Sequence, residues 1–178
     1  LITSSAASDV YKRQEHTNEA ILDRIVKINV PYCLELDQEI RIYEKLIGRS
    51  DFDSHIAPHT LKVASMFSVM SRLKDSNKWD LLTKMKIYNG EKVIEKGRVK
   101  RIDIKDLREE TKNEGMSGIS TRFITKAIDN ALTDSENNVI TPVSVMDSLT
   151  KMVKEQLVDE DFKQRCLEII QKIVREEY

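Results

Sequence analysis

Apolar residues recur at intervals of three and four along most of the chain, which is the period of helices with one buried face. Residues 36–47 carry Leu36, Ile40, Tyr43 and Ile47 on one side. The same period predicts helices over residues 18–25, 58–74, 79–88, 103–112, 119–132 and 160–177, and another directly after residue 142. One segment differs: VKINV, residues 26–30, alternates with period two, which predicts a strand without a neighbouring partner. We therefore expect a mainly α fold, preceded by one helix and one orphan strand.

Turn and cap residues set the boundaries of several of these elements. Pro58 in APHT suits the first turn of a helix, and Gly48 is a candidate C-cap for residues 36–47. Thr141 followed by Pro142 is typical of an N-cap and first helical position, after a short extended pair at residues 139–140. The segment KVIEKGRVKRI predicts a small hairpin around Gly97. The helix over residues 58–74 has apolar residues on several faces, so we expect it to be central and mostly buried.

The first fourteen residues, LITSSAASDVYKRQ, show neither a helical nor a strand period. Residues 4–14 read as an in-frame translation of the transposase adapter used in preparing short-read sequencing libraries. We expect the native sequence to start near Glu15, after an adapter-derived segment 1–14.

Charge and cysteine content exclude several classes of partner. The 29 basic and 30 acidic residues nearly cancel, so no overall field would attract nucleic acid or an anionic membrane. No apolar run approaches the roughly 20 residues that a membrane span needs. Cys33 and Cys166 match neither a zinc spacing nor a disulfide framework, which suits a reducing compartment. We expect a cytoplasmic protein with neither nucleic acid nor membrane as a partner.

Self-contained catalytic motifs are absent from the sequence. It has no phosphate-binding GxxxxGK[ST], no glycine-rich kinase loop, no HRD or DFG, no HExxH and no GxSxG. We expect the chain by itself to be inactive. His55 and His59 stand four residues apart, but Pro58 interrupts the helix that would place both on one face as metal ligands. We assign them a structural role and predict no metal site.

Two arginines have positions that could serve phosphate chemistry. Arg24 lies at the end of a short predicted helix, where it could complement the helix dipole or act as an arginine finger on a transferring phosphoryl group. Arg122 lies in the first turn of the helix that follows a loop with two glycines, beside Ser120 and Thr121. Backbone N–H groups and a cation at a helix N-terminus favour an anion such as phosphate. The residues alone leave an ordinary structural role open for both arginines.

Taken in order, several segments resemble the PrkA-type serine protein kinase family, whose chain contains an AAA+ ATPase module. They are NEAILDRI, VPY, EIRIYEKLI, HIAPHTLKVASMFSVMSRLK, KMKIYNGE, EGMSGISTRFITKAIDNAL and ITPVSVMDSL. The resemblance runs from about residue 18 to residue 157, and HIAPHTLKVA and EGMSGI are its most specific parts. The segment 91–101 diverges, and the family's Walker A and Walker B segments are not in this sequence.

The resemblance implies a division of the chain and two site residues. Residues 15–35 would hold the last helix and strand of the α/β ATPase core, residues 36–157 the helical lid, and residues 158–178 the start of a following helical region. Arg24 would be an arginine finger that reaches the ATP of a neighbouring subunit, and Arg122 would be the sensor-2 arginine that contacts ATP in its own subunit. Asn18 is not expected to be a sensor residue.

The same resemblance implies a set of ligands and partners. ATP and Mg²⁺ would be bound mainly by core segments that precede this sequence, and both ends of the family's chain would be missing. The parent would be a homo-oligomeric, ATP-dependent protein kinase that acts on a protein substrate, which the sequence does not identify.

Two alternatives remain at the level of sequence. The first is a helical module that docks a partner protein or DNA, although no predicted helix presents a basic face with base-reading residues. The second is the lid of a MoxR-like AAA+ ATPase, which would share the two arginine roles without kinase activity.

Overall fold

The computed structural model describes residues 28–49, 54–95, 98–100, 102, 104–134 and 138–177. Contacts divide the chain into two units, Leu1–Val30 and Pro31–Tyr178. In the first unit, residues 28–30 are exposed and have no regular secondary structure. The strand predicted over residues 26–30 is therefore wrong for these three residues. The remainder of that strand, the preceding helix and Arg24 lie outside the described residues. The second unit carries every element below.

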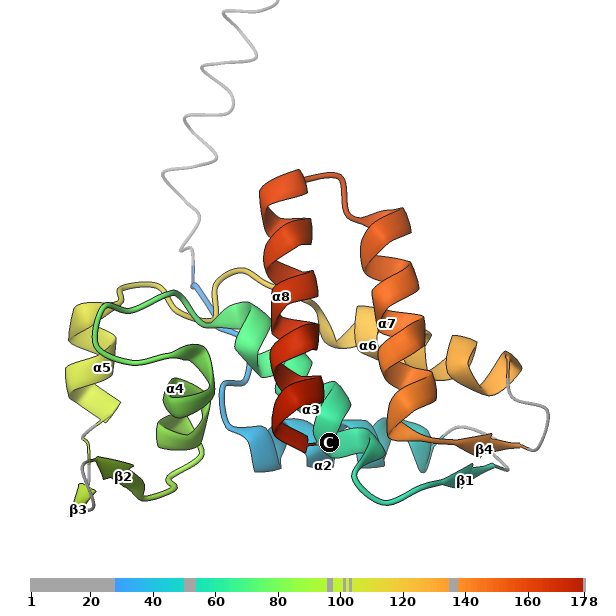
Figure 1. Ribbon diagram of the computed structural model, residues 1–178, viewed down its shortest axis with the longest axis horizontal. Helices are drawn as coiled ribbons and strands as arrows, with labels where there is room; N and C mark the ends of the chain where they lie inside the picture. The colour runs from blue at the N-terminus through green and yellow to red at the C-terminus, as the bar shows by residue number, and fades with distance from the viewer. Residues whose placement is uncertain are drawn as a thin grey trace, which may run out of the picture. The chain divides into compact units, whose positions relative to one another are not determined.

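The second unit is mainly helical, as predicted (Figure 1). Its helices are α2 (Leu36–Ile47), α3 (Thr60–Arg72), α4 (Leu81–Tyr88), α5 (Ile104–Glu110), α6 (Thr121–Thr133), α7 (Pro142–Gln156) and α8 (Glu160–Glu177). Its strands are short: β1 (His55–Ile56), β2 (Val93–Glu95), β3 (Arg98–Lys100) and β4 (Val139–Ile140). None of the described helices combines the length and the apolar character needed to cross a bilayer.

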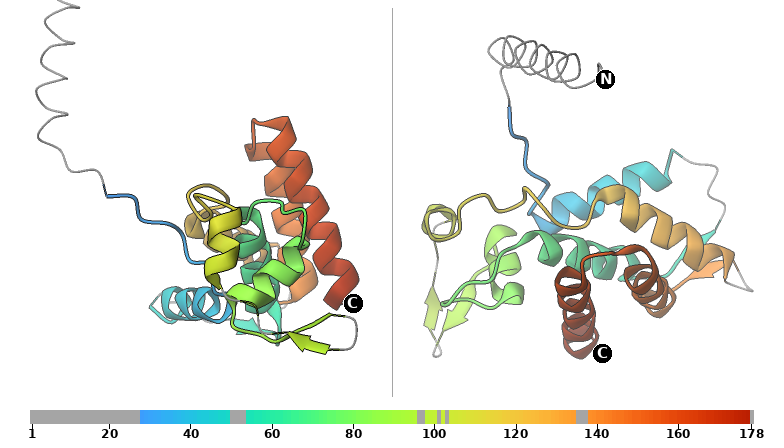
Figure 2. Two further views of the ribbon diagram at one scale, coloured as in Figure 1. Left: turned by 90° about the vertical axis from the view of Figure 1, so that its left-hand side faces the viewer. Right: turned by 90° about the horizontal axis from the view of Figure 1, so that it is seen from above.

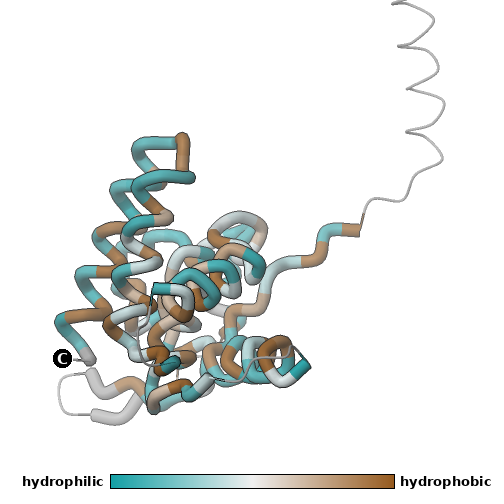
Figure 3. Tube along the Cα trace, turned by 90° about the vertical axis from the view of Figure 1, so that its right-hand side faces the viewer, coloured by the Kyte–Doolittle hydropathy of each residue, from teal (hydrophilic) through white to brown (hydrophobic). Residues whose placement is uncertain are grey.

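Helix α3 is the centre of the core, which confirms the prediction made from its many apolar faces. Val63, Phe67, Val69 and Met70 are almost completely shielded from solvent. Helices α2, α7 and α8 all pack against α3, and α4 and α6 add further contacts (Figures 1 and 2). Helices α6, α7 and α8 each bury one apolar stripe, and Figure 3 shows how hydrophobic and hydrophilic residues alternate along the chain.

A parallel pair of two-residue strands joins the starts of α3 and α7. His55 pairs with Val139 and Ile56 with Ile140. The Ile140 carbonyl then accepts hydrogen bonds from the Ala57 amide at 2.9 Å and from the Thr60 hydroxyl at 3.3 Å. The helix predicted to start at Pro58 starts at Thr60, because Pro58 and His59 form a turn between β1 and α3. His59 occupies the N-cap position with φ = 67°.

Other boundaries agree with their sequence signals. β2 and β3 form the predicted antiparallel hairpin, with Val93 opposite Lys100. Thr141 caps α7, and its side chain accepts a hydrogen bond from the Ser144 amide while the Ser144 hydroxyl accepts one from the Thr141 amide. Gly48 caps α2 in a right-handed conformation, φ = −66°, so this position does not use the left-handed freedom of glycine.

Candidate functional site

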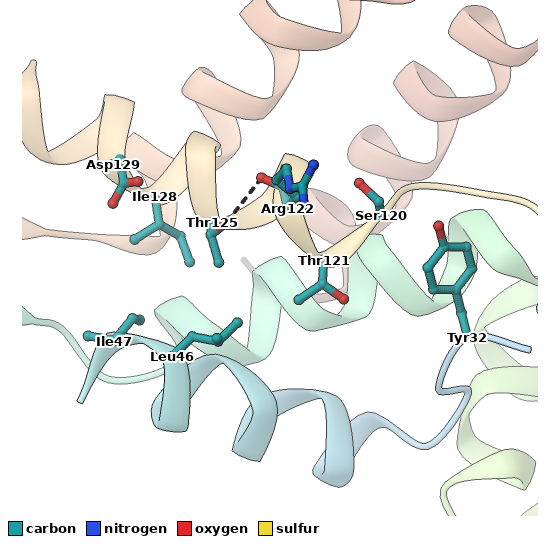
Figure 4. A pocket seen from close by; sticks show the side chains of 9 residues that line it. All are labelled: Tyr32, Leu46, Ile47, Ser120, Thr121, Arg122, Thr125, Ile128 and Asp129. Carbon is teal, nitrogen blue, oxygen red and sulfur yellow. Dashed lines mark hydrogen bonds between the residues drawn. The ribbon is translucent and has the colours of Figure 1, made fainter. Parts of the chain in front are cut away.

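A cavity of about 700 Å³ lies between the last turn of α2 and the first half of α6 (Figure 4). Its α2 side is apolar, and its α6 side is mostly polar. The aromatic ring of Tyr32, which precedes α2, forms a further wall. The lining residues are Tyr32, Leu46, Ile47, Ser120, Thr121, Arg122, Thr125, Ile128 and Asp129. A volume of this size with an apolar side and a few polar groups suits a small organic ligand.

Arg122 lies in the first turn of α6, as the sequence predicts. Ser120 is the N-cap, and its hydroxyl accepts a hydrogen bond from the Phe123 amide at 3.3 Å. The Thr125 hydroxyl donates to the Arg122 carbonyl at 3.0 Å. The Arg122 side chain is exposed, and its guanidinium has no hydrogen bond or ion pair to any described residue. The first backbone N–H groups of a helix lack acceptors within it, so this end of the cavity favours an anion.

Three residues with positive φ determine the path of the loop before α6. Asn113, Gly115 and Gly118 have φ of 65°, 77° and 123°. A Cβ atom on Gly118 would lie 2.7 Å from Cγ and 2.8 Å from Cα of Arg72, so only glycine fits against α3 there. The Gly115 amide donates to the Arg72 carbonyl at 3.2 Å, and the Gly115 carbonyl accepts from the Tyr32 amide at 2.8 Å. The loop therefore joins α3 to the segment that carries Tyr32.

Glu114 anchors the same loop to α4. Its carboxylate is almost fully buried and accepts hydrogen bonds from the Lys84 ammonium and the Tyr88 hydroxyl. The Lys74 amide donates to it as well, at 3.1 Å. Burial raises the pKa of Tyr88, and the Glu114 carboxylate raises it further because it would repel a phenolate. The Tyr88 hydroxyl therefore stays a hydrogen-bond donor.

Arg72, at the end of α3, is a buried cation that binds groups on three sides. Its Nε donates to the Ile119 carbonyl at 3.0 Å and its Nη1 to the Cys33 carbonyl, also at 3.0 Å. Its Nη2 lies 2.8 Å from Glu39 Oε1, an ion pair whose angle falls outside hydrogen-bond geometry. Its guanidinium carbon also lies 4.7 Å from the centre of the Tyr32 ring, which is cation–π distance.

Glu39 balances this charge within the core. It is completely buried, and its Oε1 accepts hydrogen bonds from the Tyr43 hydroxyl at 2.5 Å and the Ser68 hydroxyl at 3.0 Å. Burial raises the pKa of Tyr43, and the adjacent Glu39 carboxylate adds to that effect. The buried cation and anion therefore stabilise each other, and removal of only one would leave an uncompensated charge.

The other candidate residues do not converge on the cavity. His55 lies in β1 and His59 caps α3, and both are exposed. Among the described residues, no three His, Cys, Asp or Glu side chains lie close enough together to hold a metal ion. Cys33 and Cys166 are free thiols; burial raises the pKa of both, and that of Cys166 to about 12. Arg24 lies outside the described residues, so the structure does not relate it to Arg122.

The sequence did not predict the two buried ion pairs near the site, Arg72 with Glu39 and Lys84 with Glu114. Arg72 is the informative case: it occurs in a helix with apolar residues on nearly every face, where a charge requires a buried partner. Glu39 gives a weaker signal, one turn before the inward-facing Tyr43. Neither signal identifies the partner, because Glu39 and Arg72 lie on different helices.

Two family models match the chain. The model of the PrkA AAA domain matches residues 2–80, and that of the PrkA serine protein kinase C-terminal domain matches residues 82–178. They meet at the start of α4, within the expected lid of residues 36–157, whose limits stay a prediction. The first match runs through most of residues 1–14, so the adapter origin of that segment also stays a prediction.

Two curated relatives are similar over nearly the whole chain. The ATP-dependent protease PrkA of Bacillus subtilis (strain 168) is 39% identical over 165 residues, which are 90% of this chain and 26% of the relative. The serine/threonine kinase YeaG of Escherichia coli (strain K12) is 33% identical over 173 residues, 96% of this chain and 27% of the relative. The chain therefore spans about a quarter of the length of these relatives. No solved structure matches it.

Proposed function

The chain belongs to the PrkA family, and we propose that it supplies the lid side of the ATP site in an ATP-dependent serine protein kinase. In this proposal Arg122 is the sensor-2 residue that contacts a phosphate of ATP in its own subunit. Arg24 is an arginine finger that reaches the ATP of the next subunit in a cytoplasmic homo-oligomer. The phosphate-binding loop and the Mg²⁺ ligands belong to core segments that are not in this sequence.

The surroundings of Arg122 carry the proposal. Its guanidinium has no described protein partner, and it lines a cavity together with the Ser120 and Thr121 hydroxyls at a helix N-terminus. These groups all favour a negatively charged ligand. The opposite wall, formed by Leu46 and Ile47, is apolar. A nucleotide has a charged end and a flat, less polar end, so its chemistry fits both sides of the cavity.

The proposed roles follow from the chemistry of phosphoryl transfer. Bound ATP supplies the phosphoryl group, whose transfer places negative charge on the equatorial oxygens of the transition state. Arg122 would hold one phosphate in place and offset part of that charge from the lid. An arginine finger such as Arg24 would act on the transferring group itself, where such residues contribute roughly 10³ to 10⁵ in rate.

The test is substitution of Arg122 in the full-length protein. Loss of a charge-assisted hydrogen bond costs about 1.5–3 kcal/mol, which is about a 10- to 150-fold change in ATP affinity or turnover. Arg122→Ala should therefore weaken ATP binding or hydrolysis by that factor, and Arg122→Lys should restore part of it. Lys126→Ala is the matched control, because Lys126 is an exposed cation one turn later on α6 that does not line the cavity. Equal effects of the two alanine variants would refute the sensor-2 role.

A second candidate activity is ATP-dependent proteolysis, which the name of the Bacillus subtilis relative favours. Both activities use the same ATP site, so they differ in what happens to the protein substrate. Purified full-length protein would be incubated with casein and with ATP labelled at the γ-phosphate. Label incorporated into protein supports the kinase, whereas ATP-dependent release of casein peptides without label supports the protease.

A further inference from the structure

We propose that Arg72 is a positioning residue of the ATP site, which holds Tyr32 and the start of α6 at the distance that the nucleotide requires. The proposal rests on the nucleotide function given above. Arg72 does not line the cavity, so it acts through the residues that do.

Arg72 fixes the Tyr32 wall in two ways. Its guanidinium carbon lies 4.7 Å from the Tyr32 ring centre, which orients the side chain. Its carbonyl accepts the Gly115 amide at 3.2 Å, and Gly115 in turn accepts the Tyr32 amide at 2.8 Å, which holds the main chain. Tyr32 itself is more than one-third exposed, at 39%, so part of its side chain faces solvent. Loss of the guanidinium would release an aromatic wall of the cavity.

Arg72 also fixes a second part of the cavity wall, at the start of α6. Its Nε donates to the Ile119 carbonyl at 3.0 Å, and Ile119 directly precedes the N-cap Ser120. The neighbouring Ser71 hydroxyl accepts the Ile119 amide at 3.0 Å. The last turn of α3 therefore holds both backbone polar groups of Ile119, and with them the first turn that carries Arg122.

The guanidinium is suited to this task in a way that an ammonium is not. Its planar fork reaches the Ile119 carbonyl, the Cys33 carbonyl and the Glu39 carboxylate at once, and the exposed fraction of Arg72 is 2%. A lysine could keep the ion pair with Glu39 but not all of these directed contacts. Because Arg72 positions binding residues without touching the ligand, its loss should appear mainly in the KM for ATP and much less in kcat.

Arg165 provides a matched control for the loss of a partly buried arginine. Its Nη2 donates to the Leu73 carbonyl at 2.6 Å, and its Nη1 lies 3.3 Å from an Asp75 carboxylate oxygen. It thus ties α8 to the end of the same helix, one residue beyond Arg72. Arg165 does not line the cavity and contacts neither Tyr32 nor Ile119 among the described residues.

The experiment compares three variants in the full-length protein: Arg72→Lys, the double variant Glu39→Gln with Arg72→Met, and Arg165→Met. The double variant removes both buried charges, so no unpaired charge is left in the core. We expect both Arg72 variants to raise the KM for ATP by roughly tenfold, by analogy with the loss of about 10- to 100-fold when an outer-shell partner of a metal ligand is changed. Arg165→Met should lower the melting temperature without changing that KM. An unchanged KM in the Arg72 variants, or an equal rise in Arg165→Met, overturns the proposal.

Two further variants separate this proposal from the one it rests on. Tyr32→Leu removes the stacked ring without disturbing the buried charges, so it tests whether ATP binding depends on the Tyr32 wall, which the positioning role requires, even if the Arg72 variants do not fold. It should also raise the KM for ATP, and an unchanged KM there overturns the proposal. If Arg122→Ala weakens ATP binding while the Arg72 and Tyr32 variants do not, only the positioning role fails. If Arg122→Ala has no effect, the nucleotide function itself fails.

Discussion

Gly118 is the position at which a single added carbon should have the largest calculable effect on stability. In the structure its φ is 123°, a conformation that residues with a side chain rarely adopt. A Cβ atom there would lie 2.8 Å from Arg72 Cα and 2.8 Å from the Ser71 carbonyl oxygen. Both atoms belong to the backbone of α3, the central helix, so they cannot move aside as the end of a flexible side chain could.

The cost of Gly118→Ala can be estimated from these two effects. A strained backbone conformation costs about 1–3 kcal/mol, and overpacking of a core contact costs about 1–3 kcal/mol more. Their sum, about 2–6 kcal/mol, is a large share of the roughly 5–15 kcal/mol by which domains are stable. For a chain of this length it corresponds to a fall in melting temperature of roughly 5–20 °C.

Urea unfolding of the 178-residue chain, followed by circular dichroism, would measure this cost. The matched control is Gly90→Ala, since Gly90 also has positive φ, 76°, but has nothing within 4 Å of an added Cβ. It should cost only the left-handed penalty of about 1–2 kcal/mol. If the two variants lose the same free energy of unfolding at unchanged urea dependence, the close packing of this loop on α3 is wrong.

Four further predictions concern other parts of the chain. Full-length Arg24→Ala and Arg122→Ala proteins should each have low ATPase activity alone and regain part of it when mixed. In a mixed oligomer, one ATP site can take its intact Arg122 from one subunit and its intact Arg24 from the next. Absence of recovery would argue against a finger acting in trans. Cys166 should react with a thiol reagent at pH 8 far more slowly than the partly exposed Cys33. Burial raises the pKa of Cys166 from 9.0 to about 12, so the thiol ionises at lower pH in the unfolded chain than in the folded one. The free energy of unfolding should therefore fall between those two pH values by at most about 1.4 kcal/mol per pH unit. The Cys166→Ala variant should lack this fall. Thr141→Ala should lower the free energy of unfolding by about 1 kcal/mol through loss of the α7 cap, measured by urea unfolding.

Helices with one apolar face could be predicted from sequence with little error. The bounds predicted for α2 and α8 agree with those observed, and Thr141 caps α7 as expected. These features depend on residues within a few positions of one another, so period and cap chemistry suffice. The position of Arg122 in the first turn of α6 was predictable for the same reason.

Features that join distant segments could not be predicted in this way. β1 and β4 contain two residues each, too few to show an alternating pattern, and they pair across more than eighty residues of sequence. Helix α3 starts at Thr60 rather than at Pro58 because Pro58 and His59 form the turn that follows β1. The ion pair between Glu39 and Arg72 likewise joins two helices, so neither residue alone identifies the other as its partner.

The structure separates two kinds of residue within the segment EGMSGISTR. Glu114 is held by Lys84 and Tyr88, and Gly115 and Gly118 fit against α3, so contacts within the fold explain these positions. Arg122 differs from them, because its guanidinium has no hydrogen bond or ion pair to the described residues and yet lines a cavity. A long charged side chain that the fold does not use for its own stability is the strongest candidate for contact with a ligand. For this reason Arg122, rather than the glycine-rich loop before it, is the residue on which the proposed ATP site should first be tested.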